Sequence, residues 1–241
     1  MKDVIISLCD LSGAWSRPYI ELGYRVIRVD PSHGEMVTGE RGLITGNAVT
    51  GTVVQMEDGG EGWAMTAGEF ARWLAEEPGR LGRVRGVMMA PPCTDFSGSG
   101  ARHWYAKDRD GRTAASVAII HECMAVKHIA DPDWWVLENP AGRLQRLVPE
   151  VGPRQMIFHP HHFAGLLPDP AVEAYTKRTC LWGSFNTDLV KADVEPVMHT
   201  TKDGKRGSWM WAKLGGSSAK TKALRSKTPD GFAIAFAKAN P

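Results

Sequence analysis

The chain alternates between short apolar runs and longer segments that carry helix-start and helix-stop signals. Runs such as "VIISLCD" at 4–10 and "VRGVMMA" at 84–90 are typical of buried strands. The predicted strands cover 4–10, 25–30, 52–57, 84–90, 134–139, 154–159 and 178–183, and the predicted helices cover 14–24, 66–77, 110–130 and 229–240.

Local signals place several helix boundaries. Gly23 ends the helix predicted at 14–24, and Pro229 begins the last helix. Thr66 is followed three residues later by Glu69, which predicts a capping box at the start of the helix 66–77. The polar, glycine-rich stretch 31–62 predicts no element except the strand at 52–57.

This alternation predicts a single Rossmann-like α/β domain over 1–241, with a mostly parallel sheet and helices on both faces. Ligands of such sheets bind beyond the carboxyl ends of the strands. Polar or reactive residues stand at four of these ends, namely Asp10, Asp30, Pro91–Cys93 and Glu138–Asn139. We therefore expect these residues to lie along one edge of the sheet.

The composition is that of an ordinary globular protein, with 43% hydrophobic and 23% charged residues. Four scattered cysteines without a CxxC pair argue against a disulfide framework and favour a reducing, cytoplasmic setting. No apolar run approaches 18 residues, so we expect no membrane partner. The start of the chain is too short and too soon acidic for a signal peptide.

Charge is unevenly distributed, although the net charge is only +2. Residues 201–241 hold nine Lys or Arg against two Asp, a balance of 9 − 2 = +7. This excess suits a polyanionic partner, and it is equally compatible with a solvated surface of lysines.

The first predicted turn, "DLSGAWS", has a composition that suits a nucleotide-like cofactor. A strand, a small-residue turn containing Gly13 and a helix are the elements that receive such ligands. Asp30 ends the second strand about twenty residues later, where a carboxylate binds a ribose diol. A tight structural turn at Gly13 and a helix cap at Asp30 are the alternatives; together the two features favour an adenosine-bearing ligand.

The segment "APPCTDFSGSGARHW" at 90–104 places a cysteine at a stiff turn. Pro91 and Pro92 end the strand, so Cys93 would lie exposed at the sheet edge. Neighbouring amides or a substrate cation would lower the pKa of its thiol, whereas a buried cysteine would be inert. The flexible loop 94–106, with Arg102, is suited to closing over a substrate.

Glu138 ends the apolar strand of "WWVLENP". A partly desolvated carboxyl there has a raised pKa, which suits proton donation or a hydrogen bond to a ring nitrogen. Glu138 lies 138 − 93 = 45 residues after Cys93 with one predicted helix between, so a βαβ crossover would place both side chains against one ligand. The alternative is that Glu-Asn-Pro merely terminates a strand.

The histidines of "HPHHF" at 159–163 do not predict a metal site. His161 and His162 are adjacent, so an extended chain would point them to opposite faces. No Asp, Glu or Cys lies at a useful spacing in the sequence. We therefore expect no bound metal.

These motifs resemble the cytosine-5 DNA methyltransferases, in particular short methylase-like proteins of phages and bacteria. "PPCTDFS" is similar to the family's nucleophile loop, "LENP" to its Glu-Asn motif, "SLCDLSGAWS" to its cofactor loop and "YTKRTCLWG" to its substrate-side segment. The resemblance implies catalytic roles for Cys93, Glu138, Asn139 and Arg178. It implies S-adenosylmethionine binding by Asp10, Leu11, Ser12, Gly13, Asp30, Pro91 and Asn240, and substrate binding by Pro92, Thr94, Ser97, Arg102 and Lys177.

The implied activity is methyl transfer from S-adenosylmethionine to carbon 5 of a cytosine in DNA, flipped from a duplex or in a single strand, through a covalent Cys93–base intermediate. Only about 45 residues separate Gly183 from the final helix, too few for the family's usual recognition domain. A small basic insertion at 184–228 is expected to contact nucleic acid instead. The alternatives are carbon-5 chemistry on a free pyrimidine nucleotide or RNA, transfer of another group, and a catalytically silent nucleic-acid-binding relative.

Overall fold

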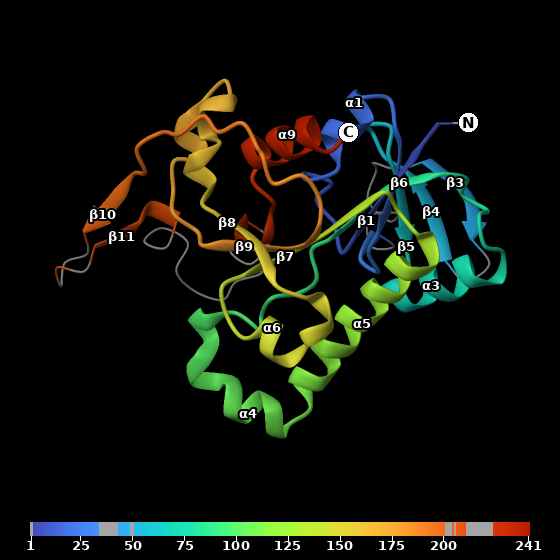
Figure 1. Cartoon of the computed structure of the whole chain (residues 1–241), viewed down its shortest axis with the longest axis horizontal. Helices are drawn as coiled ribbons and strands as arrows, with labels where there is room; N and C mark the ends of the chain where they lie inside the picture. The colour runs from blue at the N-terminus through green and yellow to red at the C-terminus, as the bar shows by residue number, and fades with distance from the viewer. Residues whose placement is uncertain (1, 34–42, 49–50, 201–203, 205, 211–223) are drawn as a thin grey trace.

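The computed structural model describes residues 2–33, 43–48, 51–200, 204, 206–210 and 224–241 (Figure 1). Among them, nine strands form one sheet in the order β3–β4–β5–β2–β1–β6–β7–β9–β8. The strands are β1 (Val4–Leu8), β2 (Arg25–Val29), β3 (Leu43–Ala48), β4 (Gly51–Gln55), β5 (Glu61–Ala64), β6 (Val84–Met89), β7 (Trp134–Pro140), β8 (Arg154–Phe158) and β9 (Thr179–Ser184).

The centre of this sheet is parallel. β5, β2, β1, β6 and β7 pair in parallel, and the flanking pairs β3–β4, β4–β5, β7–β9 and β8–β9 are antiparallel. Only β4 and β9 therefore run against the rest, so 9 − 2 = 7 strands share one direction. The predicted α/β fold with a mostly parallel sheet is confirmed.

Helices cover both faces of the sheet, as expected. On one face α3 (Ala67–Glu76) and α5 (Arg112–Ala130) bury Phe70 and Ile120 against the strands. On the other, α1 (Arg17–Glu21) and α9 (Asp230–Ala239) bury Tyr19 and Phe232 in a second cluster rich in aromatic rings. Figure 1 shows α1 and α9 on the side of the sheet away from α3 and α5.

Three elements differ from the sequence-based expectation. The strand expected at 52–57 is β4, and it is joined by β3 and β5, which the glycine-rich pattern did not indicate. α1 is shorter than expected: residues 14–16 form a turn before it, and the Arg17 amide donates to the Gly13 carbonyl at 2.9 Å. The loop expected at 94–106 is largely helical, with η1 (Gly98–His103) and α4 (Trp104–Arg109).

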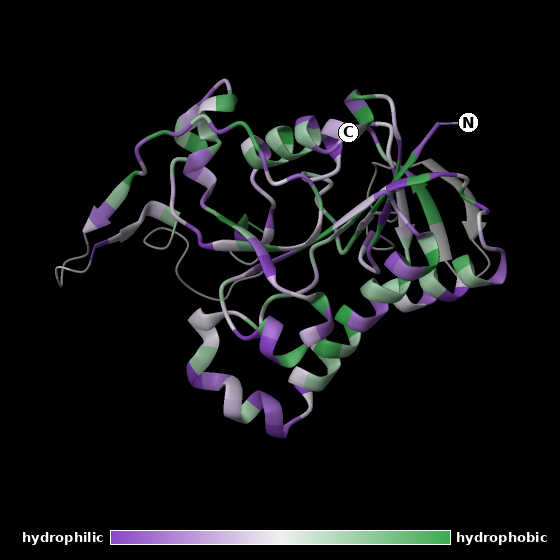
Figure 2. Cartoon of the chain, viewed as in Figure 1, coloured by the Kyte–Doolittle hydropathy of each residue, from purple (hydrophilic) through white to green (hydrophobic). Residues whose placement is uncertain are grey.

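A two-stranded sheet projects from the body within the predicted insertion 184–228. β10 (Met198–Thr200) and β11 (Arg206–Ser208) pair antiparallel, and Figure 1 shows them at the opposite end of the molecule from β3 and β4. Colouring by hydropathy shows that α4, at another extremity, is largely hydrophilic (Figure 2). In the described part of the chain, no helix has the length and apolar character needed to cross a membrane.

Candidate active site

Asp10 organises the turn between β1 and α1. Its carboxylate accepts hydrogen bonds from the Gly13 amide at 2.8 Å, from Ser7 Oγ at 2.9 Å and from Ser16 Oγ at 2.8 Å. Asp10 is buried, so its carboxylate oxygens accept hydrogen bonds from these protein groups rather than from water. Leu11 and Ser12 are the exposed residues of the turn.

Glycine is required at position 13 for two reasons. Its φ angle is +66°, in the left-handed region, and a Cβ there would lie 2.5 Å from Arg28 Cζ. Arg28 is itself buried, donating to Asp58 Oδ2 at 2.7 Å and to Ser16 Oγ at 2.7 Å. Close packing against a buried guanidinium therefore sets the path of this turn.

Asp30 leaves the sheet beside this turn. The Cys9 amide donates to the Val29 carbonyl at 2.8 Å, which places the ends of β1 and β2 side by side. Asp30 is partly exposed and accepts a hydrogen bond from the Ser32 amide at 2.9 Å.

His33 is a neighbouring residue that the sequence analysis missed. Its ring is fully buried, and within the described part of the chain neither ring nitrogen has a hydrogen-bond partner. Burial lowers the pKa of His33, so the neutral form prevails near pH 7. A buried imidazole with unpaired nitrogens beside Asp30 is a polar group suited to a ligand at this end of the sheet. A lone histidine after a polar strand end carries no recognisable sequence signal.

A hydrogen bond joins the ends of β6 and β7. The side-chain amide of Asn139, which is fully buried, donates to the Pro91 carbonyl at 3.1 Å. Pro91 is buried, whereas Pro92 and Thr94 are exposed and Cys93 between them is partly exposed. The strand ends thus hold Cys93 at the carboxyl edge of the sheet, next to Glu138 on β7.

The electrostatic surroundings of Cys93 differ from the expectation. Burial and the nearby Glu138 carboxyl raise the pKa of the Cys93 thiol, while Lys177 and Arg225 oppose this shift. Burial also raises the pKa of Glu138, again opposed by Lys177. The raised pKa expected for Glu138 is found. Of the two alternatives left open for Cys93, burial prevails over a lowered thiol pKa, because desolvation and a carboxylate outweigh the local amides and cations.

Lys177, rather than Arg178, lies close to this pair. Arg178 is exposed, its carbonyl accepts a hydrogen bond from the Ala141 amide at 3.2 Å, and its charge acts on His159 and Cys180. The structure thus does not bring the Arg178 side chain to Cys93. Arg225, from the basic segment, does act on Cys93, and general basicity was its only sequence signal.

The segment after Cys93 is anchored rather than open. Lys107 Nζ donates to the Thr94 carbonyl at 2.6 Å and pairs with Asp95 Oδ1 at 2.9 Å. Arg143, which follows β7, donates from Nε to the Asp95 carbonyl at 2.9 Å, and Ser97 forms a β-bridge with Gly142. The flexible closing loop expected here is therefore a folded segment pinned to the chain after β7.

The remaining substrate-side candidate, Arg102, lies exposed on η1. Its Nε donates to His103 Nε2 at 2.9 Å, and none of the contacts at Cys93 or Glu138 involves it.

Asn240 lies away from the other candidates. Its side chain donates to the Asn186 carbonyl at 3.1 Å and accepts from the Asn186 amide at 2.7 Å. It lines a surface hollow with Arg85 and Trp134, which stand at the start of β6 and β7. Asn240 is thus at the amino-terminal ends of the parallel strands, away from Cys93.

The fold and this edge define an α/β protein with a tight glycine turn after β1 and a cysteine–glutamate pair on adjacent strands. No family model and no curated protein matches the chain. Among solved structures, the chain is similar to one from E. coli, provisionally described as a DNA modification methyltransferase encoded within a prophage. The two share 13% identity with a TM-score of 0.47, over 99% of this chain and 69% of the other.

Proposed function

We propose that this protein transfers a methyl group from S-adenosylmethionine to carbon 5 of cytosine in DNA, with Cys93 as the nucleophile. The observation that carries the proposal is the Cys93–Glu138 pair at the carboxyl ends of β6 and β7. A thiol and a carboxyl on adjacent parallel strands, the carboxyl with its pKa raised by burial, match what carbon-5 chemistry on a pyrimidine needs.

Carbon 5 of cytosine is a weak nucleophile, and covalent addition activates it. The Cys93 thiolate would form an Sγ–C6 bond, making the electron pair of the 5,6 double bond available at carbon 5. Carbon 5 would take the methyl group as the sulfonium S–CH₃ bond breaks, leaving S-adenosylhomocysteine. Loss of the carbon-5 proton to solvent restores the double bond and breaks the Sγ–C6 bond. Cys93 leaves as the thiolate, so the residue is regenerated.

Glu138 serves this addition in its protonated form. A neutral carboxyl donates a hydrogen bond to ring nitrogen 3, which stabilises the electron-rich intermediate. Because Glu138 raises the pKa of Cys93, protonation of Glu138 also removes part of the penalty on the thiolate. The positive charges of Lys177 and Arg225 also favour the thiolate. Asn139 donates a hydrogen bond to the carbonyl of Pro91, two residues before Cys93.

The residues at the β1 and β2 ends fit S-adenosylmethionine. Leu11 and Ser12 are exposed around the tight turn at Gly13, Asp30 is available to a ribose diol, and His33 offers unpaired ring nitrogens. When bound, S-adenosylmethionine supplies an electrophilic methyl group. Asp10 acts indirectly, because it holds the turn through its bonds to Gly13 and Ser16.

Two features favour a nucleic-acid substrate. Residues 201–241 carry the balance of +7 described above, and this segment contributes Arg225 to the surroundings of Cys93. Trp209 packs edge-on against Tyr175, with the ring centroids 5.6 Å apart. Tyr175 stands two residues before Lys177 in the sequence. Trp209, which is partly exposed, together with the basic residues of this segment suits stacked bases and phosphates.

A methyl-transfer assay tests this proposal. The protein is incubated with methyl-tritiated S-adenosylmethionine and, separately, with duplex DNA, single-stranded DNA, RNA and dCMP. We expect label in DNA, absent with Cys93→Ala and unchanged with the distant exposed variant Gln155→Ala. Label in dCMP alone or in RNA alone would mean that this molecule, and not DNA, is the substrate. DNA binding with no label in any of the four would mean that the protein binds DNA without methylating it.

A further inference from the structure

A tight turn after β8 brings histidine side chains together. η3 (Pro160–His162) follows β8, and the ring centroids of His161 and His162 are 4.5 Å apart. In an extended chain neighbouring side chains diverge by about 180°, and on that geometry the sequence predicts no metal site here. In a 3₁₀ turn of three residues they diverge by about 120°, so two adjacent histidines reach the same side.

Asp193 lies against this turn, although it follows His161 by 193 − 161 = 32 residues. Two backbone hydrogen bonds hold its neighbours, from the Ala192 amide to the His162 carbonyl at 3.0 Å and from the Val194 amide to the His161 carbonyl at 3.0 Å. One donor atom from each of His161, His162 and Asp193 lies within 4.8 Å of the other two. Asp193 is therefore a third potential ligand fixed by the backbone.

The hydrogen bonding of His161 prepares it for coordination. Its Nδ1 lies 3.1 Å from the Val194 carbonyl oxygen, which can only accept, so the neutral ring carries its proton on Nδ1. The Nε2 lone pair is then free, and a backbone carbonyl on the other ring nitrogen is the usual support of a metal-binding histidine. His162 Nδ1 accepts a hydrogen bond from the His159 amide at 3.3 Å, so this ring coordinates a metal through Nδ1 only when the ion replaces that long bond.

We propose that His161, His162 and Asp193 bind a divalent transition-metal ion of the zinc class. Two imidazoles and one carboxylate form a three-ligand set typical of Zn²⁺, with water completing the coordination; Mg²⁺ and Ca²⁺ prefer oxygen ligands. The ion would fasten residues 192–194 to the β8–β9 connection.

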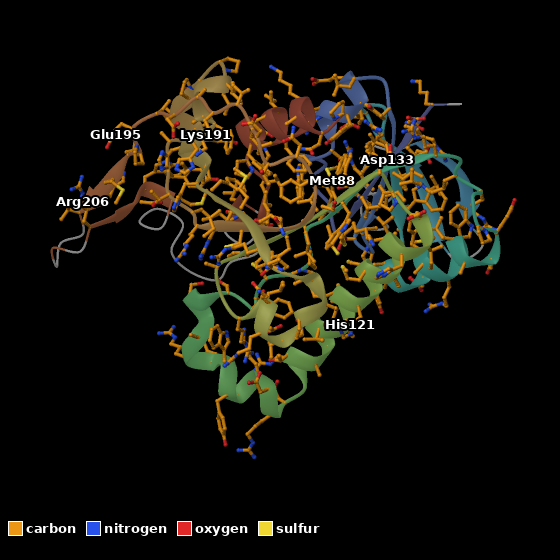
Figure 3. The ribbon with its side chains drawn as sticks, in the orientation of Figure 1. Met88, His121, Asp133, Lys191, Glu195 and Arg206 are labelled. Atoms are coloured by element: carbon orange, nitrogen blue, oxygen red, sulfur yellow. The ribbon has the colours of Figure 1, made fainter. Side chains whose placement is uncertain are left out.

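The three proposed ligands include neither Cys93 nor Glu138, although the His161 amide donates to the Tyr175 carbonyl at 3.4 Å. Figure 3 shows Lys191 and Glu195 on the segment that leads to β10. The ion would therefore anchor the chain where it enters the β10–β11 sheet, and no step at Cys93 depends on it.

Metal binding to the tag-free, full-length protein tests the proposal. Titration with Zn²⁺ by calorimetry should show one saturable site, and Co²⁺ should give visible bands without a sulfur-to-metal charge-transfer band. Asp193→Asn and His161→Ala should weaken binding by more than about 100-fold, the upper end of the effect of losing a supporting group. Asp188→Asn and His121→Ala, the matched controls at other exposed positions, should bind as the wild type does.

Hydrogen exchange distinguishes Zn²⁺ bound by His161, His162 and Asp193 from Zn²⁺ bound elsewhere on the protein. Zn²⁺ should increase the protection of amides 192–194 in the wild type and not in Asp193→Asn, whose exposed substitution leaves the fold intact. Absence of a saturable site would overturn the proposal. So would binding that survives both ligand variants, or binding that Cys93→Ala abolishes.

Discussion

The side-chain amide of Asn139 donates to the carbonyl oxygen of Pro91 at 3.1 Å, joining residues 48 positions apart at the ends of β7 and β6. Asn139 is fully buried, so this bond is shielded from water and fixes the strand end two residues before Cys93. The position of the proposed nucleophile thus depends on the strand that carries Glu138.

Replacing Asn139 by alanine should displace the Cys93 turn. The Pro91 carbonyl would lose its partner in a buried place, which costs about 1–3 kcal/mol in the free energy of unfolding. We expect kcat for methyl transfer to fall while the affinity for S-adenosylmethionine stays unchanged. Gln155→Ala, which removes an exposed side-chain amide, should change stability by less than about 0.5 kcal/mol. Unchanged kcat in Asn139→Ala would show that the turn holds without this bond.

Lys107→Met should destabilise the segment after Cys93. The substitution leaves Asp95 as an uncompensated charge, with both side chains about nine-tenths buried, and breaking such a pair costs about 3 kcal/mol. Denaturant unfolding measures the loss. The double variant Lys107→Met/Asp95→Asn should recover much of it, and failure to do so would locate the effect in the bond from Lys107 to the Thr94 carbonyl.

Asp95 should also make stability depend on pH in acid. Burial alone would raise its pKa, but hydrogen bonds from Ser116 and Lys107 outweigh burial and hold the pKa below its ordinary value of 3.8. A depressed carboxyl pKa stabilises the fold above pH 3.8 and loses that contribution as pH falls through the folded pKa. The difference in unfolding free energy between wild type and Asp95→Asn should therefore shrink below about pH 4. A difference that does not vary with pH would contradict this assignment.

Alkylation of Cys93 by iodoacetamide reads its thiolate fraction directly. Burial and Glu138 raise the pKa of the thiol above its ordinary value of 9.0, so at pH 8 the reaction should be slower than for a free cysteine peptide. Glu138→Gln should speed the reaction and Lys177→Met should slow it, as followed by mass spectrometry of the Cys93 peptide. Glu57→Gln, an exposed substitution in the β4–β5 turn, should have no effect. Equal rates in all variants would mean that Glu138 and Lys177 do not act on Cys93.

Gly13→Ala should disturb the cofactor turn more than backbone strain alone predicts. A residue with φ of +66° costs about 1–2 kcal/mol as alanine, and the new Cβ would also displace Arg28 from Asp58 and Ser16. Gly111→Ala is the matched control, since its φ is +84° and no atom lies within 4 Å of the added Cβ. We expect the larger loss of stability, and weaker S-adenosylmethionine binding, only at position 13. Equal losses at both positions would exclude the contact with Arg28.

Local patterns predicted the elements whose signals lie within a few residues. The capping box of Thr66 and Glu69 is present at the start of α3, and the apolar runs at 4–10 and 84–90 are the central strands β1 and β6. The alternation of strands and helices along the chain predicted that the central strands run parallel. The edge of the sheet that carries Cys93 and Glu138 could therefore be predicted from the sequence.

Long-range contacts explain what the sequence did not reveal. Asp193 becomes a potential metal ligand only because backbone hydrogen bonds carry it to His161. Arg225 acts on Cys93 from across the sequence, and hydrogen bonds to Asn186 hold Asn240 at the amino-terminal edge of the sheet. The raised pKa of Cys93 depends on burial, which no spacing rule encodes.

The covalent step at Cys93 is the central claim, and duplex DNA containing 5-fluorocytosine tests it most directly. Fluorine at carbon 5 cannot leave as the proton does, so the Sγ–C6 bond should persist after methyl transfer. With S-adenosylmethionine present, we predict a denaturation-resistant protein–DNA adduct that mass spectrometry maps to Cys93 and that Cys93→Ala abolishes. Methyl transfer without any adduct, or an adduct that persists in Cys93→Ala, would contradict the account.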